Sequence, residues 1–294
     1  MPVHRSGTTG RALIAAVAAL LTTPALLLAR PGGASAADIP ADPPAETSTE
    51  TSTETSTETP VRGSAHMGMG IIEHDGQGAL PRTDRAPQTE GVDVSGHQAN
   101  VNWSALWSSG VEWAYTKATE GSSYKNPHFT QQYNGAYNAG LIRGAYHFAA
   151  PDGSSGAHQA DYFVDNGGGW SRDGRTLPGV LDIEWNPYGA ACYGKTRDQM
   201  VDWIGDFLDT YRSRTGRDAV IYTATSWWKT CTGNYPGFGA TNPLWLPRYS
   251  TTVGELPAGW GFHTIWQYTN KGPIVGDHNR FNGALDRVQA LANG

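Results

Sequence analysis

From Gly91 onward, short apolar runs alternate with segments of helical periodicity, and this alternation is the feature that most constrains the fold. The clearest helix opens with Thr196 and Gln199 as a capping box, and its apolar residues then recur every three or four positions until Gly216. Strands and helices in series predict a parallel sheet wrapped by helices. The expected strands are 92–94, 112–116, 142–148, 179–184 and 219–223, and the other expected helices are 103–108, 127–140 and 157–164.

The pattern changes after Thr223. Three further strands are predicted over 244–248, 264–268 and 274–277, with no convincing helix between them. About eight strands in about 204 residues fall short of the roughly 250 residues of a complete (β/α)₈ barrel. We therefore predict an α/β fold, namely an incomplete TIM-like (β/α) barrel whose last helices are missing.

The first 88 residues differ from the rest in composition. Residues 1–37 combine a basic start, an apolar run over 12–29 and a small-residue cleavage signal, a pattern typical of a secretory signal peptide. Residues 38–88 are predicted to be disordered, because 38–60 are Thr/Ser/Glu-rich and the remainder lacks periodicity. We expect a secreted, extracellular protein with a catalytic barrel over 89–294. An uncleaved membrane anchor and a wall-spanning stalk remain alternatives for the N-terminal part.

Charge limits the classes of partner. The chain has a formal net charge of -6, and neutralising phosphates requires a surplus of Lys and Arg that it lacks. We therefore expect no nucleic acid partner, and no membrane partner after signal cleavage. From Gly91 onward the charges nearly balance, which favours a partner close to neutral.

Acidic side chains fall at the predicted carboxyl ends of strands, where barrel enzymes place their sites. Asp182 and Glu184 end one strand and, being two residues apart, face the same side, toward the barrel interior. Asp93 and Asp277 are placed at the ends of the first and last strands. We predict that all four are catalytic, with Glu184 kept protonated by the clustered negative charge so that it acts as the general acid. The alternative for each acid is a helix cap or a turn.

Polar and aromatic residues near the other strand ends are candidates for binding a sugar polymer. Trp and Tyr rings stack on sugar faces, although any one of them could instead belong to the core. The predicted substrate-binding residues are Lys117, Glu120, Tyr146, Trp185, Tyr222, Gln267 and Asn279.

The chain has two cysteines, and each follows one of two adjacent predicted strands. In a secreted protein they favour a disulfide between Cys192 and Cys231 at the rim of the cleft, with a stabilisation of about 2 to 4 kcal/mol. Two free thiols are the alternative.

Five motifs, in order at predicted strand ends, together resemble glycoside hydrolase family 25, the secreted muramidases also called N,O-diacetylmuramidases. The motifs are GVDVSGHQ (91–98), KATEG (117–121), RGAYHF (143–148), VLDIE (180–184) and DHNRFNG (277–283). The resemblance covers residues 90–294. It implies hydrolysis of the β-1,4 bond between N-acetylmuramic acid and N-acetylglucosamine in peptidoglycan. It also implies Glu184 as the acid, the three aspartates as supporting carboxylates and Tyr146 as lining a subsite.

The expected partner is therefore the peptidoglycan glycan strand, with no cofactor and no metal. We expect a monomer, because an enzyme that acts on an insoluble polymer gains little from assembly. Asp182 could orient the N-acetyl group of the substrate for attack on the anomeric carbon, a route we favour slightly over inversion. Three rival functions stay open: a chitinase with a D-x-E signature, a metal-dependent hydrolase using Asp93, His97, His147 and Asp182, and a non-catalytic sugar-binding barrel.

Overall fold

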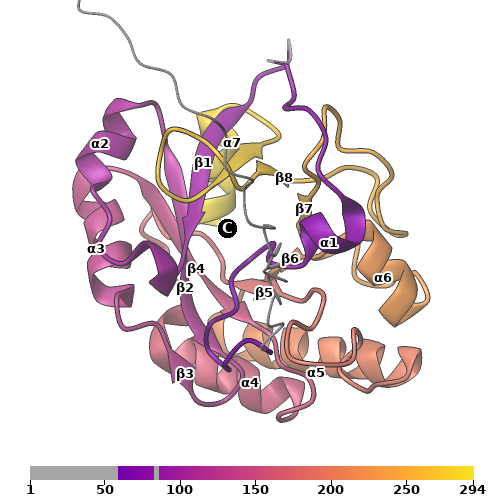
Figure 1. The fold of residues 1–294 in the computed structure, drawn as a ribbon. Coiled ribbons are helices and arrows are strands. Elements are labelled where there is room, and N and C mark those ends of the chain that lie inside the picture. Colours follow the sequence, from indigo (N-terminus) through magenta and orange to yellow (C-terminus); the bar gives the residue numbers. More distant parts are fainter. Residues whose placement is uncertain (1–58, 83–85) are drawn as a thin grey trace, which may run out of the picture. The chain divides into compact units, whose positions relative to one another are not determined.

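The computed structural model describes residues 59–82 and 86–294. Within them, eight strands close a barrel in the order β1, β2, β4, β5, β6, β7, β8, β9, and β9 pairs with β1 (Figure 1). This confirms the predicted α/β barrel. The strands are β1 (Thr89–Val94), β2 (Trp113–Glu120), β4 (Ile142–Phe148), β5 (Val180–Asp182), β6 (Val220–Tyr222), β7 (Leu244–Pro247), β8 (Ile265–Thr269) and β9 (Asp277–Phe281), with β3 (Tyr124–Lys125) pairing outside the ring.

Helices cover the outside of the barrel between the early strands (Figure 1). The predicted capping box is present, since the Thr196 side chain accepts from the Gln199 amide and Gly216 ends the helix in the left-handed region. No helix separates β7 from β8 or β8 from β9 among the described residues, as predicted. The helices are α2 (Trp103–Ser108), α3 (Phe129–Ala139), α4 (Gly156–Phe163), α5 (Arg197–Thr215), α6 (Thr225–Thr232) and α7 (Leu285–Asn293), with a one-turn helix at Gly96–Gln98 and a π-turn at Val164–Gly168.

Two helices, α6 and α7, were not predicted, and α7 follows β9 where a missing helix was expected. The sequence of α6 is rich in threonine and tryptophan, which are only moderate helix formers. Trp227 and Trp228 are fully buried, so tertiary packing rather than local propensity accounts for this helix.

The last predicted strand, 274–277, is wrong in position and direction. The strand is Asp277–Phe281, and it runs antiparallel to both β8 and β1. Its sequence is mostly polar, so it lacks the apolar pattern by which the other strands were found. Because β9 is reversed, its first residue, Asp277, lies at the barrel end where the other strands finish.

The barrel interior is filled by aromatic side chains. Tyr115 and Trp245 have ring centroids 5.1 Å apart, and Trp245 lies edge-on to Tyr222 at 5.4 Å. Trp113 completes this group, and all four side chains are fully buried. The interior is therefore a packed core, so ligand access is restricted to its end.

The predicted disulfide is present. It joins Cys192, in the connection after β5, to Cys231 in α6, with the Cα atoms 5.3 Å apart. It therefore links two neighbouring connections near one end of the barrel.

Part of the predicted linker is ordered, which corrects the assignment of residues 38–88 as disordered. Residues 62–78 lie against the carboxyl ends of the strands and include the short helix α1 (Ile71–Asp75) (Figure 1). Ala65, Met67 and Ile71 are almost completely buried there. These apolar residues are too few and too irregularly spaced to predict an element, so their order comes from tertiary contact. The predicted signal peptide and the Thr/Ser/Glu-rich stretch lie outside the described residues.

No helix in the described residues is both long and apolar enough to span a bilayer.

Candidate active site

The four predicted catalytic carboxylates come from three strands. Asp182 is the last residue of β5, and Glu184 follows two positions later. Asp93 in β1 stands directly opposite Asp277 in the β1–β9 register. The negative charge of Asp93 raises the pKa of the other three carboxyls, which places all four in one electrostatic cluster.

Burial is the main cause of the altered acidity of this cluster. It raises the pKa of Glu184 to about 8, against the weaker opposing effect of the Gly68 and Gly70 amides. Burial also raises the pKa of Asp93 to about 7, and it holds the pKa of Asp182 and Asp277 well above their usual range. Neighbouring charge, the cause expected from the sequence, raises the pKa of Glu184 less than burial does. Glu184 is thus protonated at neutral pH, as a general acid must be.

Asp93 is held by a network of amide and hydroxyl groups. Asn279 Nδ2 donates to Asp93 Oδ2 at 2.7 Å, and Gln267 Nε2 donates to the same oxygen at 3.0 Å. Gln267 also reaches Asp277 Oδ2 at 3.3 Å, and its own oxygen accepts from Tyr222 at 2.7 Å. Asp93, Asp277 and the predicted binding residues Tyr222, Gln267 and Asn279 therefore form one connected group.

Asp182 differs from Asp93 in its hydrogen-bond partners. Both of its carboxyl oxygens, and Oε2 of Glu184, are buried, and within the described part of the chain no amide, hydroxyl or cationic group hydrogen-bonds to them, so these three oxygens have only the other carboxyl of the pair as a partner. Unpartnered buried polar atoms are costly, and they are expected where a ligand supplies the partner. This pair is therefore the part of the cluster best placed to bind a ligand.

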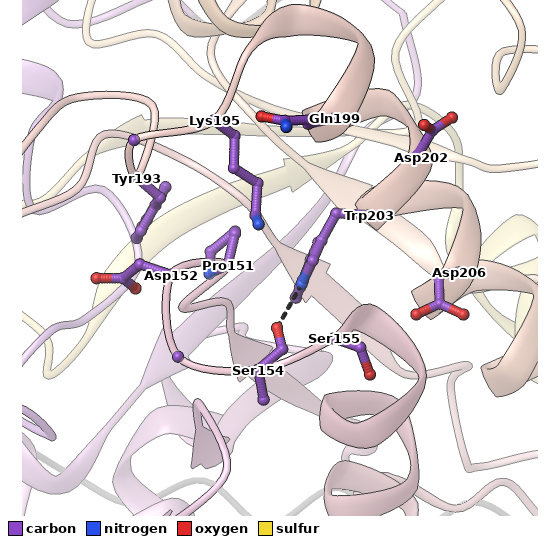
Figure 2. A pocket seen from close by; sticks show the side chains of 12 residues that line it. Pro151, Asp152, Ser154, Ser155, Tyr193, Lys195, Gln199, Asp202, Trp203 and Asp206 are labelled. Carbon is purple, nitrogen blue, oxygen red and sulfur yellow. Dashed lines mark hydrogen bonds between the residues drawn. The ribbon is translucent and has the colours of Figure 1, made fainter.

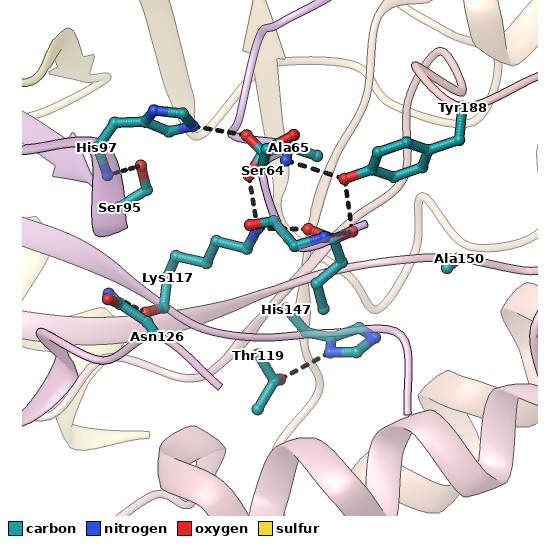
Figure 3. A network of polar contacts seen from close by, with 12 residues as sticks. Ser64, Ala65, Ser95, His97, Lys117, Thr119, Asn126, His147, Ala150 and Tyr188 are labelled. Atoms are coloured by element: carbon teal, nitrogen blue, oxygen red, sulfur yellow. Dashed lines mark hydrogen bonds and ion pairs between the residues drawn. The ribbon is translucent and has the colours of Figure 1, made fainter. Parts of the chain in front are cut away.

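A second polar group lies beside the carboxylates and is shown in Figure 3. Lys117 and Glu120, both from β2, form a fully buried ion pair with Nζ 2.6 Å from Oε2. The Tyr188 hydroxyl donates to Glu120 Oε1 at 2.6 Å. Burial lowers the pKa of Lys117, whereas Glu120 opposes that change. Tyr188 was not among the predicted binding residues. Its aromatic ring, close after Glu184 in the sequence, was a reason to expect it near the site.

The two remaining predicted binding residues differ in exposure. Tyr146 is fully buried in the barrel, and burial, then Asp93 and Asp182, raises the pKa of its hydroxyl well above the usual range. Trp185 is partly exposed and stacks on His74 with ring centroids 3.9 Å apart. Tyr249, one of the aromatic residues expected near the strand ends, follows β7 and donates to Gln267 Oε1 at 3.0 Å.

The two histidines of the metal-hydrolase alternative have different partners: the His97 ring contacts the Ser64 carbonyl and the His66 ring. The His147 ring is hydrogen-bonded to Thr119 at 2.8 Å and to Gln159, in α4, at 2.9 Å, and it stacks on Phe207. It therefore faces the outer helices, whereas Asp182 faces the barrel end. Among the described residues, no three His, Cys, Asp or Glu side chains are grouped to hold a metal ion.

A surface hollow of about 740 Å³ lies beside the cluster rather than over it. It is lined by the connection after β4 and the start of α5, including Asp152, Lys195 and Trp203, whose indole nitrogen donates to the Ser154 carbonyl at 2.8 Å (Figure 2). Asp182 and Glu184 are absent from its lining.

The sequence model for Glycosyl hydrolases family 25 matches residues 92–277, which contain all four carboxylates. The chain belongs to this family. As a member of family 25, it is a glycoside hydrolase of the lysozyme type.

Its family 25 relatives include bacterial and fungal proteins. Lysozyme M1 of Streptomyces globisporus is 52% identical over 241 residues, covering 79% of this chain and 82% of that protein. An N,O-diacetylmuramidase of Chalaropsis sp is 47% identical over 209 residues, covering 70% of this chain and 99% of the relative. The structure of the bacterial lysozyme from Streptomyces coelicolor is 52% identical with a TM-score of 0.69, covering 71% of this chain and 99% of its own.

A solved fungal structure is similar to this chain to the same extent. The muramidase from Acremonium alcalophilum is 54% identical with a TM-score of 0.69, covering 70% of this chain and 99% of its own. The barrel from Thr89 onward makes up about 70% of this chain, so the match to Lysozyme M1 extends into residues that precede the barrel.

Proposed function

We propose that this enzyme hydrolyses the β-1,4 bond between N-acetylmuramic acid and N-acetylglucosamine in bacterial peptidoglycan. The observation that carries the proposal is the contact of Glu184, buried and protonated at neutral pH, with Asp182, whose buried carboxyl oxygens accept no hydrogen bond from an amide, hydroxyl or cationic group among the described residues. Relatives named lysozyme and N,O-diacetylmuramidase support the choice of substrate.

Glu184 is the proposed general acid, and it donates its proton to the glycosidic oxygen as that bond breaks. The carbonyl oxygen of the substrate's N-acetyl group attacks the anomeric carbon and forms a cyclic oxazolinium intermediate. Asp182 accepts a hydrogen bond from the N-acetyl N–H, which orients the group. The Asp182 carboxyl is ionised in this step, because the positive charge developing on the N-acetyl group favours the carboxylate and opposes the burial that raises its pKa. Ionised Glu184 then takes a proton from the water that opens the ring, so the product keeps its configuration.

The other polar residues bind and position the substrate in this proposal. Asn279 and Gln267 hold Asp93 in one orientation, so it lies as a fixed carboxylate beside the reactive pair. Lys117 and Glu120 offer a donor and an acceptor for sugar hydroxyl and amide groups. Trp185 offers an aromatic face for stacking on a sugar ring.

The stereochemistry of the product tests the mechanism. Proton NMR of the digestion of purified peptidoglycan should show the β-anomer first, and an α-anomer as first product would overturn the assisted route. Mass spectrometry of the muropeptides should place the new reducing end on N-acetylmuramic acid.

Chitin should remain intact under the same conditions, and activity should persist in excess EDTA. Degradation of chitin would favour the chitinase alternative, and loss of activity in EDTA would favour the metal-dependent one.

Secretion is part of the proposal, because the substrate lies outside the cytoplasm. It rests on the signal-peptide pattern of residues 1–37. Amino-terminal sequencing of the protein from culture medium should show that this segment is absent, and recovery of the chain only from the cytoplasm would contradict secretion.

A further inference from the structure

Residues 62–78, here termed the covering segment, lie directly over the proposed site. The Gly68 amide donates to Glu184 Oε1 at 2.6 Å, so the proposed general acid already has a partner from the chain itself. Gly68 has a left-handed φ of +79°, and a Cβ at this position would lie 2.4 Å from the Tyr249 hydroxyl and 2.7 Å from Gln267 Oε1. The backbone therefore approaches the catalytic residues as closely as glycine permits.

The covering segment also occupies the second polar group, as Figure 3 shows. The Gly63 amide donates to Glu120 Oε1 at 2.8 Å, and the Ala65 carbonyl accepts from Lys117 Nζ. The Ala65 amide donates to the Tyr188 hydroxyl at 2.9 Å. One extended stretch of backbone thus uses the donors and acceptors that the proposed function assigns to a glycan strand.

Apolar anchors fix the covering segment in place. Met67 is fully buried and packs into the aromatic cluster of the barrel that includes Tyr146 and Tyr222. Ile71 in α1 is also fully buried. Burying two apolar side chains of this size stabilises the docked position.

Both ends of the covering segment are also held. Arg62 forms an ion pair with Asp152, and His74 stacks on Trp185 where a sugar ring would otherwise stack. The Gly78 amide donates to the Tyr249 carbonyl at 2.7 Å. The contacts therefore extend along the whole proposed cleft rather than being confined to one point.

We propose that the covering segment inhibits the enzyme by occupying its glycan-binding cleft, and that an endoprotease activates the enzyme by cutting the chain between Gly78 and Thr89. This inference rests on the proposed function, which supplies the identity of the cleft. Hydrolysis consumes one water and leaves a new carboxylate and a new amine, so the covering segment is no longer tethered to the barrel. A tether of about ten residues gives a docked segment an effective concentration in the millimolar range, and dilution removes that advantage after cleavage.

The first test cuts the full chain after it has folded. Residues 79–86 are replaced by the recognition sequence of a specific protease, and lysis of a peptidoglycan suspension is measured before and after digestion and dilution. We expect activity to rise about tenfold or more on cleavage. Equal activity of the uncut and cut chains would overturn the inhibition.

Point variants test the contacts themselves. In the uncut chain, Met67→Asp and Gly68→Val should raise activity toward that of the cut enzyme, because the first places a charge in an apolar core and the second introduces a clash. Val61→Ala, at a position 78% exposed just before the covering segment, is the matched control and should change nothing. Activity of Met67→Asp and Gly68→Val no higher than that of the control would overturn the proposal.

A binding measurement separates the inhibition from the chemistry. In a Glu184→Gln background, calorimetric titration with a soluble peptidoglycan oligosaccharide should show binding only after cleavage. Equal binding before and after cleavage, or none in either form, would overturn the inhibition. A cut wild-type enzyme that binds the oligosaccharide without hydrolysing it would instead contradict the proposed function.

Discussion

The cluster of four carboxylates and the covering segment meet at the same barrel end, but they are held in different ways. Asp93 and Asp277 are fixed by strand pairing and by shared amide donors, so their positions follow from the barrel backbone. The covering segment pairs with no strand, and isolated contacts with side chains such as Met67 and Gly68 hold it in place. Because the carboxylates are held by strands, their arrangement can persist when the covering segment leaves. Substitutions in the two regions should therefore have different effects on the cut and the uncut chain.

Glu184→Gln should give the largest effect. Activity of the cut enzyme should fall about 10² to 10⁴-fold, because glutamine cannot donate an acidic proton. Docking of the covering segment should survive, since the Gln side-chain oxygen can still accept from Gly68. Lysis assays, and protection of Met67 from oxidation, measure the two effects. Glu255→Gln, at an exposed acid away from the cluster, is the control, and a similar loss there would contradict the assignment.

Asp182→Asn should lower activity of the cut enzyme about 10²-fold, because the carboxamide cannot stabilise positive charge on the N-acetyl group. The fall should appear in kcat more than in KM. Asp93→Asn is the comparison, since its partners Asn279 and Gln267 can still donate to the retained carbonyl oxygen, and its loss should be smaller. The reverse order would show that Asp93, not Asp182, acts on the substrate.

Removing the disulfide by Cys192→Ala with Cys231→Ala should lower the free energy of unfolding by about 2 to 4 kcal/mol. The disulfide joins the connection after β5 to α6, so the decrease in the free energy of unfolding should arise in the barrel. Urea unfolding of the cut and uncut chains should show the same decrease. A decrease confined to the uncut chain would mean that the disulfide stabilises the covering segment instead.

Stability should depend on pH through Glu184. Because burial raises its pKa from an ordinary value near 4.5 to about 8, the folded state binds more protons than the unfolded state between these values. Its contribution to stability is therefore complete below about pH 4.5 and is lost as the pH rises through 8. Thermal unfolding should show that Glu184→Gln loses less stability than wild type over this interval, and parallel curves would contradict the shift.

Arg62→Ala should give the smallest effect. The Arg62–Asp152 ion pair is partly exposed, and such pairs contribute about 1 kcal/mol or less. Activity of the uncut chain should rise by about twofold, far less than with Met67→Asp. A rise as large as that of Met67→Asp would mean that the end contact, rather than the buried anchor, holds the covering segment.

Local patterns predicted the elements that local chemistry controls. Thr196 and Gln199 marked the start of α5 because a capping box is a contact within one turn, and Gly216 marked its end because glycine tolerates a left-handed φ. The position of strand β9 was not predicted because its polar residues are buried through partners on neighbouring strands: Asn279 donates to Asp93, and Arg280 donates to Glu90. Helix α6 escaped prediction because its tryptophans gain their stability from distant partners.

The sequence alone determined the α/β barrel and the set of acids at its mouth, because both follow from periodicity and from the two-residue repeat of a strand. Tertiary structure decided the reversal of β9, which brings Asp277 opposite Asp93, and the burial that raises the pKa of Glu184. It also decided the docking of residues 62–78. Their glycines and few apolar side chains form no local pattern, and contact with the barrel end orders them. Burial and long-range contact depend on residues far apart in the chain, and no local pattern records them.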